Sequence, residues 1–228
     1  GILLAIATVC FFAALQHLPM AEAISIYFVQ PLILTALSAL FLGEQIRQRR
    51  IIAIVIGLFG VVMILQPSIV IFGTPALFPL ATALAMAGYV TITRRLAGKA
   101  HPFQMQFIVG ITATIALGAT MLIGQMFDLA GTGFIMPNVQ QFEWIIYMGL
   151  VATIGHIFIV WAANNAPASV LAPFQYTEII SSVILGYLVF GDLPAKSTIV
   201  GVCIIVGCGI YLFHRERIAA QEDRQAGR

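Results

Sequence analysis

The sequence predicts an all-α integral membrane protein, built as an inverted-repeat helical bundle. Hydrophobic residues make up 61% of the 228 residues and charged residues only 9%, whereas soluble domains carry about 25% charged residues. The mean hydropathy is +1.01. The apolar residues form long runs, and a helix needs about 20 of them to cross the hydrocarbon core. An internal repeat, described below, predicts the inverted-repeat bundle.

Eight apolar runs are predicted to span the membrane. They cover residues 1–16, 20–43, 50–66, 70–93, 103–127, 142–163, 168–190 and 197–213. The connections between them are mostly short and carry turn or breaker residues, such as Pro67 and Pro102. The charged segment 214–228 is expected to be a solvated tail.

The basic residues predict the orientation of these runs. Ten of the eleven Lys and Arg residues follow the second, fourth or eighth run, and the exception is Lys196. The ten are Arg47, Arg49, Arg50, Arg94, Arg95, Lys99, Arg215, Arg217, Arg224 and Arg228. With eight consecutive crossings, they all fall on one side of the membrane. Because cytoplasmic loops are rich in Lys and Arg, we expect a multi-pass protein of the bacterial inner (plasma) membrane with a cytoplasmic C-terminus.

An internal repeat relates the two ends of the chain. A shift of 148 residues overlays residues 14–66 on 162–214, with Pro19 on Pro167. Each copy reads as a loop with Pro, a long apolar run, a Gly-acidic pair and a second apolar run. The copies are five predicted crossings apart and therefore enter the membrane from opposite faces. This is the inverted-repeat architecture of many secondary transporters.

The repeat also predicts the domains. Residues 1–66 are expected to be the last three helices of the first copy, and residues 70–213 the five helices of the second. Completing the symmetry requires two further helices before the first residue. We therefore expect a ten-helix architecture of which eight helices are present, in an N-terminally truncated chain. A protein of eight helices is the alternative.

The two copies share a more specific pattern. The first contains Pro31-Leu-Ile-Leu-Thr-Ala-Leu-Ser-Ala-Leu-Phe-Leu-Gly43-Glu44, and the second Glu178-Ile-Ile-Ser-Ser-Val-Ile-Leu-Gly-Tyr-Leu-Val-Phe-Gly191-Asp192. Each resembles the end of an EamA domain, and the tandem resembles EamA-type transporters of the drug/metabolite transporter (DMT) superfamily. The resemblance implies a ten-helix carrier with a central cavity, which moves small organic metabolites by alternating access. The Glu-Pro pair of that family is divided here into Gln30-Pro31 and a Glu178 without proline.

Glu178 is the first candidate for a functional residue. A charged side chain at the bilayer centre costs at least about 2.5 kcal/mol, and such residues usually face a cavity or a partner. Gln175 and Ser182 share its predicted helix face at spacings of three and four. The repeat overlays Tyr27 on Gln175 and Gln30 on Glu178. We expect these five residues to bind substrate or line the cavity. A protonated Glu178 bonded to a neighbouring helix is the alternative.

Three further polar residues lie within or beside the apolar runs. His156 could relay a proton or contact substrate near neutral pH, with a packing role as the alternative. Tyr89 is a candidate for lining the cavity. Glu22 follows Pro19 at a predicted helix start, where a carboxylate facing the positive end of the helix dipole is the favoured interpretation.

The preferred function is secondary active transport of a small organic metabolite. Because no basic residue is predicted at mid-membrane depth, we expect a neutral, zwitterionic or cationic substrate, such as an amino acid, vitamin, nucleoside or drug-like molecule. Glu178 could couple transport to protons by loading and releasing one as the cavity changes sides. Import and export are both open.

Other classes are weighed against this function. A membrane-embedded enzyme is one alternative, but the sequence has no His-Glu-x-x-His or Gly-x-Ser-x-Gly motif. A channel or assembly subunit is another. The three cysteines match no metal or redox motif, so no cofactor or metal is expected. The expected partners are the substrate and the lipid bilayer, with no nucleic acid, and the protein is expected to be a monomer or homodimer.

Overall fold

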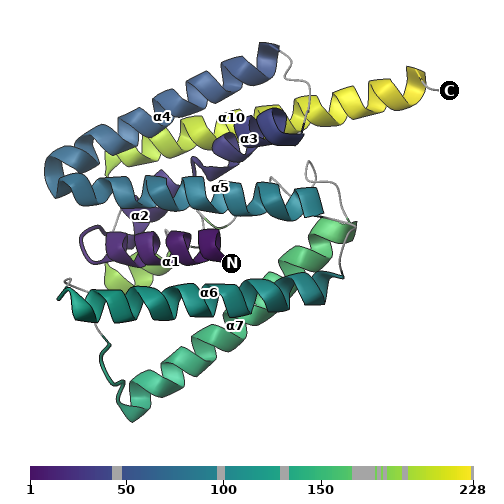
Figure 1. Ribbon diagram of the computed structural model, residues 1–228. Helices are drawn as coiled ribbons and strands as arrows, with labels where there is room; N and C mark the ends of the chain where they lie inside the picture. Colours follow the sequence, from purple (N-terminus) through teal and green to yellow (C-terminus); the bar gives the residue numbers. More distant parts are fainter. Residues whose placement is uncertain are drawn as a thin grey trace. The chain divides into compact units, whose positions relative to one another are not determined.

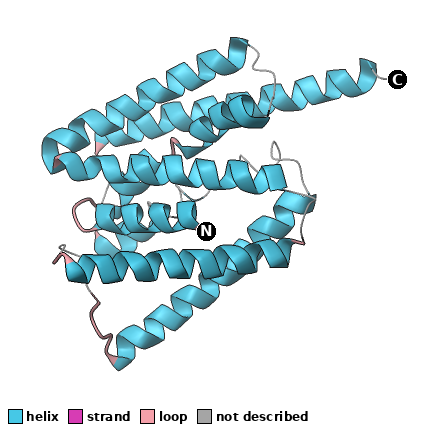
Figure 2. Ribbon diagram, viewed as in Figure 1, coloured by secondary structure: helices cyan, strands magenta, loops and turns pink. Residues whose placement is uncertain are grey.

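The regular secondary structure of the chain is helical. The computed structural model describes residues 1–42, 48–96, 101–128, 134–165, 178, 181, 184–191 and 195–226, and these residues contain no strand (Figure 2). The elements, shown in Figure 1, are α1 (Ile2–Leu15), α2 (Met20–Tyr27), α3 (Gln30–Leu42), α4 (Gln48–Phe72), the 3₁₀ turn η1 (Thr74–Leu77), α5 (Phe78–Leu96), α6 (Pro102–Met126), α7 (Val139–Asn165), the π-helical η2 (Gly186–Phe190) and α10 (Lys196–Ala226).

The lengths and composition of the helices fit a membrane protein. Four stretches of the described chain are long and apolar enough to cross a bilayer: Met20–Leu37, Val55–Phe72, Thr74–Leu96 and Phe103–Met126. Two shorter apolar helices, Ile2–Leu15 and Lys196–Tyr211, coincide with further predicted runs. Most of the predicted run 168–190 lies outside the described residues.

The chain forms two compact units. One contains Gly1–Ala5 and Leu96–Pro167, and the other contains Ile6–Arg95 and Ala168–Arg228. In the first unit, α6 packs against α7. The second unit holds the main apolar core, to which α2, α4 and α10 contribute fully buried isoleucines.

The run 20–43, predicted as one helix, is broken between α2 and α3. Pro31 is the physical cause, because proline has no N–H to donate to the carbonyl four residues earlier, which is that of Tyr27. At the break the Val29 N–H donates to the Ile26 carbonyl, three residues earlier, at 3.2 Å. This is a 3₁₀-type bond, which spans one residue fewer than an α-helical bond. The Tyr27 carbonyl thus lacks its helical donor in the middle of an apolar segment.

Pro67 has a different effect. The sequence predicts a turn at residues 66–68, but α4 continues through Pro67 to Phe72. The turn comes at Gly73, whose φ of 74° lies in the left-handed region that glycine adopts readily. One missing backbone bond does not end an apolar helix, because leaving further backbone groups unpaired in lipid would cost more. The helix predicted at 70–93 consequently begins later, as α5 preceded by η1.

Replacing Pro31 with alanine should repair the break between α2 and α3. The new N–H can bond the Tyr27 carbonyl, and a net gain of about 1 kcal/mol corresponds to about fivefold slower exchange of the neighbouring amides. Hydrogen–deuterium exchange read by mass spectrometry measures this change. Pro102→Ala is the matched control, because Pro102 is the first residue of α6, where an N–H has no helical acceptor. Equal effects of the two substitutions would contradict the role assigned to Pro31.

The charged end of the chain is also helical. Residues 214–228 are predicted as a solvated tail, and α10 continues through them to Ala226. This segment has no Gly or Pro before Gly227, and it is rich in Ala, Arg, Glu and Gln, which favour helices. The high charge of the segment therefore does not interrupt the helix.

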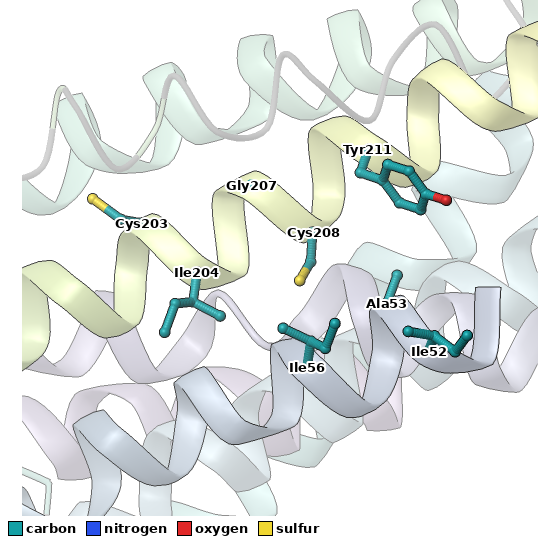
Figure 3. A pocket seen from close by; sticks show the side chains of 8 residues that line it. All are labelled: Ile52, Ala53, Ile56, Cys203, Ile204, Gly207, Cys208 and Tyr211. Atoms are coloured by element: carbon teal, nitrogen blue, oxygen red, sulfur yellow. The ribbon is translucent and has the colours of Figure 1, made fainter. Parts of the chain in front are cut away.

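The most extensive helix–helix contact in the described chain joins α4 and α10, which lie side by side in Figure 1. A Cβ atom built on Gly60 of α4 would lie 3.0 Å from the Gly201 carbonyl oxygen of α10. Further along the pair, Ala53 and Cys208 line one apolar groove, in which Cys208 points toward α4 (Figure 3). Residue numbers thus rise along α4 as they fall along α10, and the two helices are antiparallel.

The repeat relates these two contacts to each other. The 148-residue shift carries Gly60 onto Cys208 and Ala53 onto Gly201. The contact of Gly60 with Gly201 therefore corresponds, in the repeat, to the pair of Ala53 and Cys208. Equivalent helices that meet antiparallel in this way are expected of an inverted repeat.

Glycines allow membrane helices to approach closely. Gly57 of α4 is such a place, because a Cβ there would collide with the Leu32 side chain. Gly110 and Gly118 of α6 differ from Gly57. A Cβ built on either glycine has no atom within 4 Å in the described structure.

Candidate substrate site

Glu178 lies in a helical part of the chain, and its side chain is exposed. The Ser181 hydroxyl, one turn later, donates to the Glu178 carbonyl at 3.1 Å. Gln175 and Ser182, which were predicted on the same helix face, lie outside the described residues. The acidic side chain therefore lies at the surface of the structure.

Tyr27 and Gln30 flank the break between α2 and α3. Tyr27 is the last residue of α2, and its ring makes edge contacts with Phe11 and Phe28 at centroid distances of 6.3 and 5.9 Å. The Glu178 carboxylate lies within electrostatic reach of the Tyr27 hydroxyl. Gln30, the first residue of α3, is 3% exposed. The structure thus brings Tyr27 and Glu178, from the two repeat copies, within electrostatic range of each other.

The break supplies polar backbone groups where an unbroken helix would hide them. The end of α2 presents carbonyl oxygens such as that of Tyr27, and these carry partial negative charge. At the start of α3, Pro31 has no N–H, and the Leu32 and Ile33 N–H groups already donate to the Val29 carbonyl. Discontinuous helices in transporters use such ends to bind ions and charged groups of substrates. With the Glu178 carboxylate nearby, the site offers acceptors to a cationic group.

Two further predicted site residues are found on α5 and α7. Tyr89 is half-buried in α5, and its carbonyl accepts a hydrogen bond from the Thr93 hydroxyl at 2.8 Å. His156 is half-buried in α7, which belongs to the unit that does not contain Glu178. The described contacts join neither residue to the pair of Tyr27 and Glu178.

Glu22 is the residue whose contacts sequence reasoning missed. It lies in the first turn of α2, as predicted, but it is only 7% exposed and accepts hydrogen bonds from α10 as well. The interpretation as a carboxylate that serves only its own helix start is therefore incomplete. A buried acidic side chain is costly unless it is hydrogen-bonded, and its donors here are far away in the sequence.

The family of the chain follows from comparison with known proteins. Residues 1–66 and 73–214 match the EamA-like transporter family. This chain belongs to that family. No solved structure matches it.

Several transporters are similar to this EamA-family protein along most of its length. The pseudopaline exporter of Pseudomonas aeruginosa is 28% identical over 212 residues, which cover 91% of this chain and 71% of the relative. An uncharacterized transporter of Helicobacter pylori is 29% identical over 211 residues, covering 91% and 69%. An S-adenosylmethionine uptake transporter of Rickettsia felis is 25% identical over 209 residues, covering 91% and 68%.

The family assignment decides between the function classes. The EamA-like family and these relatives are transporters, so the protein is a transporter and the enzyme alternative is discarded. The assignment and the apolar helices together indicate a multi-pass membrane protein.

Proposed function

We propose that this protein is a secondary active transporter that works by alternating access between two inverted repeats. The antiparallel contact of α4 and α10 supports the repeat, because the 148-residue shift exchanges its two ends. In such carriers one half rocks against the other around a fixed site. The orientation, with the C-terminus in the cytoplasm of a bacterial cell, follows from the ten basic residues on one predicted side.

The observation that carries the proposal is that Glu178 lies within electrostatic range of Tyr27, the residue at the helix break. A carboxylate and the Tyr27 carbonyl favour an ammonium or another cationic group. Among the neutral, zwitterionic and cationic classes, the site therefore favours metabolites that carry a cationic group, which include zwitterions. S-adenosylmethionine, named for several relatives, carries an amino-acid group and belongs to this class.

Glu178 is also the proposed proton-coupling residue. A carboxyl group can carry a proton when the cavity faces one side and release it when the cavity faces the other. The proposal sets no direction of substrate movement, since relatives of similar identity are named for uptake and for export. The solute and the lipid bilayer are the proposed partners.

Uptake of labelled zwitterions into proteoliposomes that contain the purified protein tests this function. Labelled S-adenosylmethionine and a mixture of amino acids are the probes, and the expected result is saturable uptake that an excess of one unlabelled zwitterion abolishes. Empty liposomes provide the control. Uptake of a sugar phosphate that zwitterions do not compete with would contradict the proposed substrate class.

A further inference from the structure

A buried carboxylate outside the proposed substrate site joins the ends of three helices. The Thr198 hydroxyl, in the first turn of α10, lies 2.7 and 2.8 Å from the two carboxylate oxygens of Glu22. The Ala195 N–H donates to Glu22 Oε1 at 3.2 Å. Ser68 Oγ of α4 donates to the Ile64 carbonyl of its own helix at 2.8 Å and lies 3.4 Å from Glu22 Oε2. Glu22, Ser68 and Thr198 are 7%, 3% and 1% exposed, so water is excluded from the cluster.

The cluster is stable only while the three helix ends stay together. Glu22 lies in the first turn of α2, and Ala195 directly precedes α10, so the positive ends of two helix dipoles face one carboxylate. If α10 moved away, Glu22 would lose the Thr198 hydroxyl and the Ala195 amide together. A buried carboxylate without donors is strongly unfavourable, so separation requires water to enter.

The cluster connects the two repeat copies at one end of the bundle. Glu22 lies in the first copy and Ser68 at the end of α4, which begins in that copy, whereas Thr198 lies in the second. The 148-residue shift replaces Glu22, Ser68 and Thr198 by Val170, Glu216 and Arg50. The sequence at the equivalent positions therefore provides no such set of a carboxylate and two hydroxyls.

We propose that Glu22, Ser68 and Thr198 form a clasp that closes the transporter at the face where α2 and α10 begin, and that opening to this face requires the clasp to part. The proposal rests on the alternating access proposed above, because rocking separates the contacts that join the two halves at one face. By the orientation proposed from the basic residues, this face is the outer one. The clasp is a positioning device and does not touch substrate.

Labelling of a buried reporter thiol tests the clasp without any substrate. Ser25, one turn after Glu22 on α2, is 1% exposed and becomes the reporter as Ser25→Cys in the protein with Cys10, Cys203 and Cys208 replaced by alanine. A membrane-impermeant maleimide is added to intact cells. Thr198→Val removes the hydroxyl and keeps the shape, so labelling should become about tenfold faster, the effect of losing one hydrogen bond to a charged group.

Thr198→Ser keeps the hydroxyl and is the matched control, with labelling expected at the parent rate. Thr93→Val, which removes a hydroxyl that donates to the Tyr89 carbonyl of its own helix, should also leave the rate unchanged. If Thr198→Val does not yield a monodisperse protein, Ser68→Ala provides the second variant, with a smaller increase expected. Folded Thr198→Val or Ser68→Ala protein that labels at the parent rate overturns the clasp.

The side from which the reagent acts separates a gate from a purely structural contact. In inside-out vesicles, the same reagent should label parent and Thr198→Val protein equally, whereas general loosening would raise labelling from both sides and contradict the clasp. Failure of the proposed function would appear separately, as absent uptake in proteoliposomes. Saturable uptake together with unchanged Ser25→Cys labelling would reject the clasp alone.

Discussion

Gly201→Leu is expected to prevent the protein from accumulating in folded form. A Cβ atom at this position would lie 2.7 Å from the Gly60 carbonyl oxygen and would collide with the Ile64 side chain. Because the obstacle includes backbone, α4 and α10 must move apart, and this pair is the most extensive contact in the described chain. Overpacking typically costs about 1–3 kcal/mol and occasionally more, and helix association in membranes depends on such close approach.

The measurement for Gly201→Leu is the yield of monodisperse protein after extraction in detergent, followed by its thermal midpoint. We expect at least about tenfold less monodisperse protein, because about 1.4 kcal/mol already shifts an equilibrium tenfold. Gly118→Leu on α6 is the control, since a Cβ there meets no atom within 4 Å, and near-parental yield is expected. A parental thermal midpoint for Gly201→Leu would show that α4 and α10 do not pack as described.

Glu178→Gln is expected to lower substrate uptake by about 10- to 100-fold. The amide keeps the size of the side chain but removes the charge, and a hydrogen bond to a charged group contributes about 1.5–3 kcal/mol. The loss should appear in the initial rate of uptake into proteoliposomes at matched protein content. Glu143→Gln is the control, because Glu143 is exposed on α7. Parental uptake by Glu178→Gln would exclude the proposed role of this carboxylate.

The sequence predicted most helices because apolar length is a local property. The runs 70–93 and 103–127 appear as α5 and α6 with small shifts at their ends. Prolines in such runs were harder to interpret. Pro31 interrupts its helix and Pro67 does not, although both follow a glutamine in an apolar run. The difference depends on the backbone bonds formed nearby, such as that from Val29, and these cannot be read from composition.

In the candidate site, too, contacts between residues far apart in the sequence were hard to predict. The repeat overlay pointed to Tyr27 and Glu178, because duplication carries spatial information across 151 residues of sequence. No comparable signal connected Glu22 with Thr198, which lies 176 residues later. Each is an ordinary residue for the first turn of a helix, and only the packing of α2 against α10 brings the carboxylate to the hydroxyl.

Uptake driven by a pH gradient is the measurement that tests the proposed carrier most directly. Proteoliposomes with the parental protein should accumulate a labelled zwitterion when a proton gradient is imposed, and should only equilibrate it when the gradient is collapsed. The same vesicles with Glu178→Gln should show little uptake in either condition. Saturable accumulation that is equal for both proteins and unaffected by the gradient would contradict a carrier centred on Glu178.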